Sequence, residues 1–261
     1  MRFGGLIIAV VLAGTAVVAP TPAQASKPGD FRITAHRGAP TSDITENTLR
    51  SMRRAIRLKA SAVELDVRMT KDGQFVLLHD PTLERTTDCR GRVDQRSMHY
   101  LRKHCRGSRG GEMVPTLGAA LRLAERNHAN VLMEFKGERW PRADVARLGR
   151  AVVKAGMQRR VTAMSFHPSP LRRIEDTHPG VASTLLVRQW AQVAEALTYA
   201  DGVTLPVDQM TRGRVDAVRD AGGRVIAKKA NSHSRWRQLK RLGVGDLITD
   251  RVSGYRDWLH R

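Results

Sequence analysis

The chain has 261 residues and carries 45 lysines and arginines against 25 aspartates and glutamates, a formal net charge of +20. This length suits one large domain or two small ones. Aromatic residues make up only 5% of the chain, too few for the stacking platforms of a single-strand binder, and the arginines are scattered along every segment. We therefore interpret the charge as solvated helix faces and expect no nucleic-acid partner.

The chain begins with features of an export signal. Arg2 precedes an apolar run over 6–19, and "TPAQAS" then offers a small-x-small cleavage site after Ala25. We predict a signal peptide over 1–25 and a secreted mature domain over 26–261, extracellular or in the cell envelope. An uncleaved N-terminal anchor is the alternative. No other segment is apolar enough to cross a membrane, so no stable membrane insertion is expected.

Apolar runs and amphipathic stretches alternate along the rest of the chain. Strands are predicted at 31–36, 62–68, 130–136, 161–166, 182–187, 202–206, 224–229 and 246–250, and helices at 47–60, 116–127, 143–156, 169–178, 191–200, 212–222, 234–243 and 252–260. Eight strand–helix units in about 235 residues predict an α/β fold of the (β/α)8 TIM barrel type. An open doubly wound sheet is the alternative.

The stretch "VELDVRMTKDGQFVLLHD" at 63–80 departs from this alternation. Glu64 and Asp66 are two residues apart and so project to one face of a strand. The Lys-Asp-Gly turn at 71–73 should send the segment 75–80 back as an extra β-hairpin, which places His79 opposite or nearly opposite Asp66.

The segment 85–115 is rich in glycine and arginine and is predicted to be an insertion over one barrel mouth. It contains the only two cysteines, Cys89 and Cys105. Export favours a disulfide between them, and two free thiols are the alternative. Their spacing does not resemble a zinc site.

Four polar clusters fall at predicted strand ends, where a barrel gathers its chemistry. They are His36-Arg37-Gly38, Glu64-x-Asp66, His79-Asp80 and Glu134-x-Lys136. Three carboxylates without a thiol suit Ca2+ or Mg2+. Arg37 and Lys136 could bind a phosphate, and His36 and His79 could exchange protons on either side of it. Each cluster alone could instead be a structural ion pair or a turn.

These residues lie within an ordered series of motifs. The series is "AHRG" at 35–38, "ENT" at 46–48, "ELDV" at 64–67, "T-x-DG" at 70–73, "HDPTLERTT" at 79–87, "VPTL" at 114–117, "MEFK" at 133–136, "SF" at 165–166 and "ITD" at 248–250. In this order and spacing the chain resembles the glycerophosphodiester phosphodiesterase family, in its exported bacterial type, from about residue 33 to 251.

The resemblance implies a barrel that hydrolyses glycerophosphodiesters to glycerol 3-phosphate and an alcohol. By position, it implies metal ligation by Glu64, Asp66 and Glu134. It also implies general acid and base roles for His36 and His79, phosphate contacts from Arg37 and Lys136, and a supporting role for Glu46. The substrate would be a small glycerophosphodiester or a glycerol-phosphate polymer.

One motif departs from the family, which usually reads Trp-Thr-Val-Asn where this chain has "KKAN", Lys228 to Asn231. Lys228 replaces an aromatic wall of the mouth with a cation on a flexible stem. It either selects substrates with an extra anionic group or turns to solvent. Asn231 keeps the family's residue at the mouth.

Two other functions fit parts of the sequence. A phospholipase D or sphingomyelinase D relative would use similar residues on intact lipid, but its mouth loop should be hydrophobic, and the segment 85–115 is polar and basic. A non-catalytic binder of anionic envelope polymers would use the basic surface, and it should lack a ligand or a histidine.

Overall fold

A closed parallel barrel forms the centre of the molecule in the computed structural model, which describes residues 32–260. The strands are β1 (Arg32–Ala35), β2 (Ala62–Met69), β3 (Phe75–Leu77), β4 (Asn130–Phe135), β5 (Val161–Ser165), β6 (Ala182–Leu186), β7 (Gly202–Pro206), β8 (Arg224–Lys228) and β9 (Asp246–Thr249). All neighbours pair in parallel except β2 and β3, and β1 pairs with both β2 and β9, which closes the barrel. The (β/α)8 prediction is confirmed, and the open sheet is wrong.

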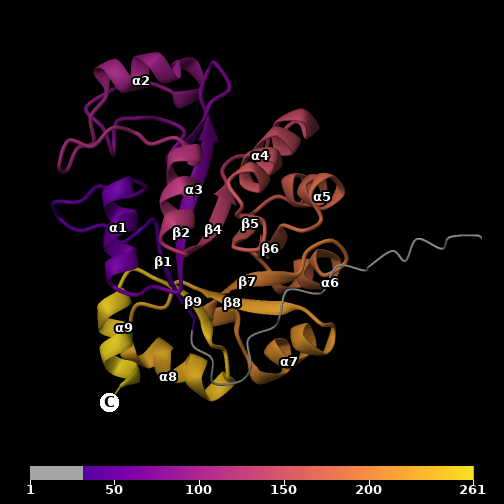
Figure 1. The fold of residues 1–261 in the computed structure, drawn as a ribbon. Coiled ribbons are helices and arrows are strands. Elements are labelled where there is room, and N and C mark those ends of the chain that lie inside the picture. Colours follow the sequence, from indigo (N-terminus) through magenta and orange to yellow (C-terminus); the bar gives the residue numbers. More distant parts are fainter. Residues whose placement is uncertain (1–31, 261) are drawn as a thin grey trace, which may run out of the picture.

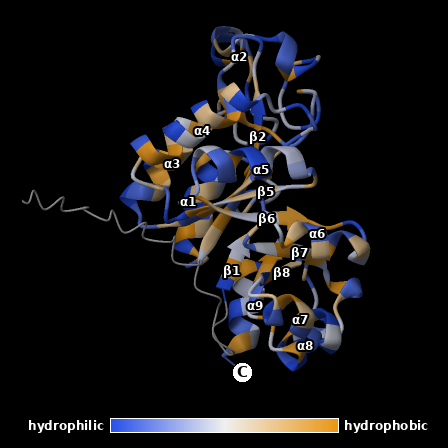
Figure 2. Ribbon diagram, turned by 90° about the vertical axis from the view of Figure 1, so that its right-hand side faces the viewer, coloured by the Kyte–Doolittle hydropathy of each residue, from blue (hydrophilic) through white to orange (hydrophobic). Residues whose placement is uncertain are grey.

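Helices surround this barrel, as Figure 1 shows. They are α1 (Leu49–Arg57), α2 (Met98–His104), α3 (Leu117–Arg126), α4 (Arg142–Lys154), α5 (Pro168–Thr177), α6 (Val193–Ala196), α7 (Arg212–Asp220), α8 (His233–Leu242) and α9 (Val252–Leu259). Each of the longer helices buries apolar residues toward the strands, and hydrophobic and hydrophilic residues alternate along α3 and α4 (Figure 2).

Helix α4 shows how the sequence produces this packing. Val145, Leu148 and Val152 recur at helical spacing and are fully buried against the barrel. The helix ends where Gly156 takes a left-handed backbone (φ +67°), and its N–H donates to the carbonyl of Val153. Glycine adopts this conformation without a Cβ clash, so the residue terminates the helix.

The predicted helix at 191–200 is shorter in the structure. A 3-10 turn over Trp190–Gln192 leads into α6, which ends at Ala196. The Thr198 hydroxyl donates to the carbonyl of Glu195. A hydroxyl that competes for a backbone carbonyl favours a turn over a further helical turn, and the apolar periodicity did not reveal this.

The insertion between β3 and α3 packs around its own small core beside the barrel. Cys89 and Cys105 form the predicted disulfide, and both are buried with Leu83, Leu101 and Val114. The sequence did not predict α2, which crosses the top of the insertion in Figure 1. Ser97 caps this helix by accepting from the Tyr100 N–H.

Between residues 32 and 260, none of the helices combines the length and apolar character that a membrane span requires. The predicted signal peptide over 1–25 lies outside the described residues.

Candidate active site

Three acidic side chains meet at the carboxyl ends of β2 and β4. Glu64 and Asp66 project to one face of β2 because they are two residues apart, and Glu134 lies directly beside Asp66 in the parallel register. All three are almost fully buried, and each offers an oxygen within 4.8 Å of the others. The structure thus gathers the predicted ligand set.

Burial and neighbouring charges shift the pKa values of two of these carboxylates. Burial, followed by the charges of Asp66 and Glu134, raises the pKa of Glu64 well above its usual range. Burial also opposes ionisation of Asp66, but the charges of Lys136, His79 and Arg37 outweigh it and lower the pKa of Asp66. A bound cation would reduce the repulsion among these three carboxylates.

The donor set fits a hard divalent ion. Asn47 donates from Nδ2 to Asp66 Oδ2 at 2.7 Å and accepts the Asp66 N–H at 3.0 Å. Asp66 Oδ1 is buried and has no hydrogen-bond donor within residues 32–260, although Lys136 Nζ lies 3.4 Å away. A buried oxygen of this kind, in a cluster of carboxylates only, is suited to Ca2+ or Mg2+.

Two cations border the cluster. The Lys136 ammonium lies 2.7 Å from Glu134 Oε1. Arg37 donates its backbone N–H to Glu64 Oε2 at 2.6 Å, and its side chain lies 3.4 Å from Asp66 Oδ2. The left-handed backbone of Arg37 (φ +52°) allows both contacts from one residue. Both predicted phosphate-binding residues therefore lie beside the predicted ligands.

The two predicted proton carriers are each paired with a carboxylate. His36 Nδ1 lies 2.6 Å from Asp250 Oδ1, and His79 Nδ1 lies 2.6 Å from Asp80 Oδ1. Because a carboxylate only accepts, each Nδ1 carries the proton, and in a neutral ring Nε2 then holds the lone pair. Burial lowers the pKa of His79, and this outweighs the opposing charge of Asp66 and the hydrogen bond that His79 donates to Asp80.

The hairpin brings His79 to the site nearly as predicted. Val67 pairs with Leu77, and the Leu78 N–H donates to the carbonyl of Asp66, so Leu78 stands opposite Asp66 and His79 is the next residue.

A continuous set of ion pairs joins the two sides of the site. Arg85 donates to Asp80 at 2.5 Å and makes two contacts with Glu46, at 2.7 and 3.0 Å. Glu46 accepts in turn from Arg37 at 2.9 Å. The predicted supporting residue Glu46 thus links the partner of His79 to the arginine beside the carboxylates.

Lys228 extends from the end of β8 and is half-buried. Its ammonium lies 4.7 Å from the centre of the Phe166 ring. Burial lowers the pKa of Lys228, and the charges of Glu134 and Glu64 oppose that shift. The cation therefore acts electrostatically on two of the predicted ligands.

Asn231, three residues after Lys228, holds the partner of His36. Its Nδ2 donates to Asp250 Oδ2 at 2.6 Å, and its Oδ1 accepts the Asp250 N–H at 2.9 Å. Burial disfavours ionised Asp250, but His36, Asn231 and Lys229 outweigh it and hold the Asp250 pKa far below its usual value.

Sequence reasoning gave no role to several residues that contact the predicted ones. They are Asn47, Asp80, Arg85, Phe166 and Asp250. Each lies inside a motif that the sequence analysis had quoted, and membership of these motifs was the available signal. Their pairing depends on which side chains meet across loops.

Known proteins resemble this chain over most of its length. The sequence profile of the Glycerophosphoryl diester phosphodiesterase family matches residues 36–253. A glycerophosphodiester phosphodiesterase of Bacillus subtilis strain 168 is 27% identical over 273 residues, which cover 95% of this chain and 91% of that protein.

Solved structures of proteins with this family name also resemble the chain in sequence and fold. A candidate glycerophosphodiester phosphodiesterase from Galdieria sulphuraria is 27% identical with a TM-score of 0.80, covering 88% of this chain and 98% of that one. A glycerophosphodiester phosphodiesterase from Agrobacterium tumefaciens is 25% identical with a TM-score of 0.73, covering 87% and 99%. The chain belongs to the glycerophosphoryl diester phosphodiesterase family.

Proposed function

We propose that this protein is an exported, metal-dependent phosphodiesterase that hydrolyses glycerophosphodiesters to glycerol 3-phosphate and an alcohol. The observation that carries the proposal is the buried cluster of Glu64, Asp66 and Glu134, flanked by two histidines that each have a carboxylate partner. The names of the family and of the similar proteins support the same reaction.

Substrate binding is assigned to the cations beside the carboxylates. Arg37 and Lys136 would meet the phosphate oxygens, whose negative charge increases toward the transition state. Arg37 is fixed by Glu46, and Lys136 by Glu134, so neither cation must be reoriented when substrate arrives. The site is therefore preorganised for a phosphodiester.

Glu64, Asp66 and Glu134 would together hold the divalent ion. When bound, Ca2+ or Mg2+ would withdraw electron density from a phosphoryl oxygen and offset the charge of the three carboxylates.

Each histidine would carry out one proton transfer, His79 as the base and His36 as the acid. The lowered pKa of His79 leaves its ring neutral at pH 7, so Nε2 is able to accept a proton from the attacking oxygen. That oxygen forms a bond to phosphorus while the bond to the alcohol oxygen breaks. His36, whose Nδ1 is held by Asp250, would donate a proton from Nε2 to the departing alkoxide.

A comparison of histidine variants tests this assignment. We expect His36→Asn and His79→Asn each to reduce release of glycerol 3-phosphate from glycerophosphocholine at least 10²-fold, with unchanged circular dichroism. His128→Asn is the matched control, because His128 is exposed and its left-handed backbone (φ +52°) tolerates asparagine. Full activity in either site variant would refute the proton-transfer roles.

Lys228 would set preference among substrates. Its ammonium is positioned to attract a further anionic group, as in a glycerol-phosphate polymer, where the family usually offers an aromatic wall. We expect Lys228→Trp to change the ranking of kcat/KM among glycerophosphocholine, glycerophosphoinositol and polyglycerol phosphate more than the highest kcat. An unchanged ranking would show that Lys228 takes no part in selection.

The sequence pattern over 1–25 and the disulfide, which persists in oxidising compartments, support the proposal of export. Mass spectrometry of secreted protein should find a mature chain that begins at Ser26. A chain that keeps residues 1–25 would favour the anchor instead.

A further inference from the structure

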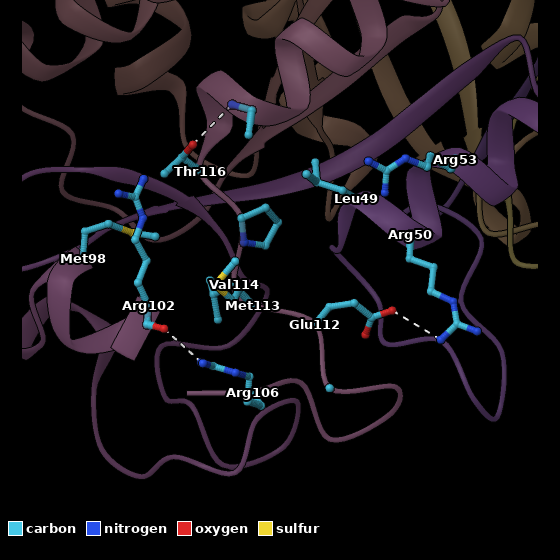
Figure 3. A pocket seen from close by; sticks show the side chains of 13 residues that line it. Leu49, Arg50, Arg53, Met98, Arg102, Arg106, Glu112, Met113, Val114 and Thr116 are labelled. Atoms are coloured by element: carbon cyan, nitrogen blue, oxygen red, sulfur yellow. Dashed lines mark hydrogen bonds and ion pairs between the residues drawn. The ribbon is translucent and has the colours of Figure 1, made fainter. Parts of the chain in front are cut away.

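A second cavity lies away from the carboxylate cluster, between α1, α3 and the insertion. Its volume is about 570 Å3, within the range of small-molecule sites. Leu49 reaches it from α1, Ala119 from α3, and Met98 from α2, while Met113 and Val114 lie between them (Figure 3). None of the residues that line it belongs to the proposed catalytic site.

The cavity combines an apolar floor with a basic rim. Four arginines border it: Arg50 and Arg53 from α1, Arg102 from α2, and Arg106 from the loop that follows α2. In Figure 3 these two pairs stand on opposite sides of Met113 and Val114. Met113 is one of only two large apolar side chains that are clearly exposed within residues 32–260.

The contacts of these arginines show which of them could bind a ligand. Arg106 donates to the carbonyls of Arg102 and Cys105, and Arg50 pairs with Glu112 at 3.5 Å. The guanidinium groups of Arg53 and Arg102 have no hydrogen-bond or ion-pair partner in the described part of the chain.

We propose that this cavity binds a single-chain amphiphile with an anionic head, a carboxylate or a phosphate monoester. The acyl chain would cover the apolar floor at Leu49, Met113 and Ala119, and the head would pair with Arg53 or with Arg102, whose side chains stand on opposite sides of that floor. Glu112, the one acid at the rim, is already paired with Arg50.

The apolar floor and the basic rim together favour this ligand over inorganic phosphate and over a neutral amphiphile. Inorganic phosphate would gain the charge but leave Met113 exposed. A neutral amphiphile would cover the floor but leave both guanidinium groups unpaired. Tight binding therefore requires both parts in one molecule. The proposal does not depend on the phosphodiesterase activity, because the two sites share no residue.

Titration calorimetry with the whole mature protein tests the proposal. The probes are dodecyl phosphate and laurate below their micelle concentrations, inorganic phosphate, and dodecyl maltoside. We expect one site for dodecyl phosphate or laurate, at least tenfold tighter than for either of the other probes. Equal affinity for dodecyl maltoside would overturn the charge requirement, and equal affinity for phosphate would overturn the apolar one.

Paired variants locate the site. Arg53→Ala with Arg102→Ala should weaken dodecyl phosphate binding at least tenfold. Arg57→Ala with Lys103→Ala removes the same charge from exposed positions on the same two helices outside the cavity and should leave binding unchanged. Ala119→Phe fills the floor without a charge change and should also weaken binding. Equal weakening by both charge pairs, or no effect of Ala119→Phe, would refute the site.

A last experiment measures binding of the protein to lipid vesicles. Binding to phosphatidylglycerol vesicles without binding of the monomeric probes would overturn the proposal in favour of a membrane surface. Release of glycerol 3-phosphate in the cavity variants, measured in parallel, shows whether a failure concerns this cavity alone or the catalytic site as well.

Discussion

At the scale of single residues, Glu64 combines nearly complete burial with repulsion from two neighbouring carboxylates. It is 1% exposed, and burial together with Asp66 and Glu134 raises its pKa. Its position is tolerated because the Arg37 N–H and Lys228 offset part of that cost. Such a residue is expected to matter for metal binding more than for folding.

Glu64→Gln tests this expectation. The amide still accepts the Arg37 N–H, but one of three repelling charges is removed, so the metal-free protein should be at least as resistant to urea as the parent. Activity should fall at least 10²-fold, and the stabilisation by added Ca2+ or Mg2+ should disappear. Glu138→Gln, at an exposed loop position, is the control. Retained metal stabilisation in Glu64→Gln would contradict the ligand assignment.

For Asp80, the direction of its effect on the pH dependence of activity can be predicted. Burial opposes its ionisation, but hydrogen bonds from Arg85 and His79 outweigh this and lower its pKa to about 2, so it is charged throughout the working range. Its charge and hydrogen bond raise the pKa of His79. Loss of that charge should therefore lower the pKa of His79 further.

If His79 accepts the proton, kcat/KM rises as pH rises through the pKa of His79. Asp80→Asn should move this acidic limb to lower pH and reduce kcat about 10²-fold, since the ring also loses its orienting partner. Asp94→Asn removes an exposed acid of the same insertion and should change neither. An acidic limb that stays in place in Asp80→Asn would exclude His79 as the base.

The sequence predicted which carboxylates and histidines lie together at the candidate site but not the residues that contact them. Glu64, Asp66 and Glu134 were recognisable because carboxylates interrupt apolar strands. Asp250 and Arg85 were not, because their roles depend on contacts with His36 and Glu46, which are 214 and 39 residues away. Long-range side-chain pairing of this kind leaves no periodic signal.

At the scale of elements, the insertion is the part with its own small core. The Cys89–Cys105 bond closes it across a separation of 16 residues. In the chain-entropy account, such a loop contributes about 3 kcal/mol. Arg85 stands at the start of this segment and contacts both Asp80 and Glu46, so loosening of the insertion should reach the site.

Cys89→Ser with Cys105→Ser tests this coupling. Hydrogen exchange over 85–115 should accelerate strongly, while exchange in β4 to β9 stays close to that of the parent, and kcat/KM should fall several-fold. Equal loss of protection in the barrel strands would show that the insertion is not a separate unit of stability.

The elements of the barrel were predicted better than those of the insertion. Strands such as β7 match their predicted bounds because buried parallel strands are continuous apolar runs between turns. Helix α2 has only Met98 and Leu101 buried among basic neighbours. Two apolar residues are too few to give a recognisable helical periodicity in a segment rich in glycine and arginine.

At the scale of the whole molecule, part of the arginine excess serves the fold. Arg256 donates to the carbonyl of Leu58, Arg219 to that of Gly243, and Arg147 to that of Gly73. These bonds satisfy backbone groups at turns and at the ends of elements and connect distant parts of the chain. The absence of a nucleic-acid partner stays a prediction.

The central claim concerns the reaction itself. The decisive measurement is release of glycerol 3-phosphate from glycerophosphocholine by the mature protein, first after chelation and then with Ca2+ or Mg2+ restored. The account predicts no release after chelation and recovery with at least one ion. Undiminished release after complete chelation would contradict the role of the carboxylate cluster, and no release with either ion from glycerophosphocholine, glycerophosphoinositol or polyglycerol phosphate would contradict the proposed reaction.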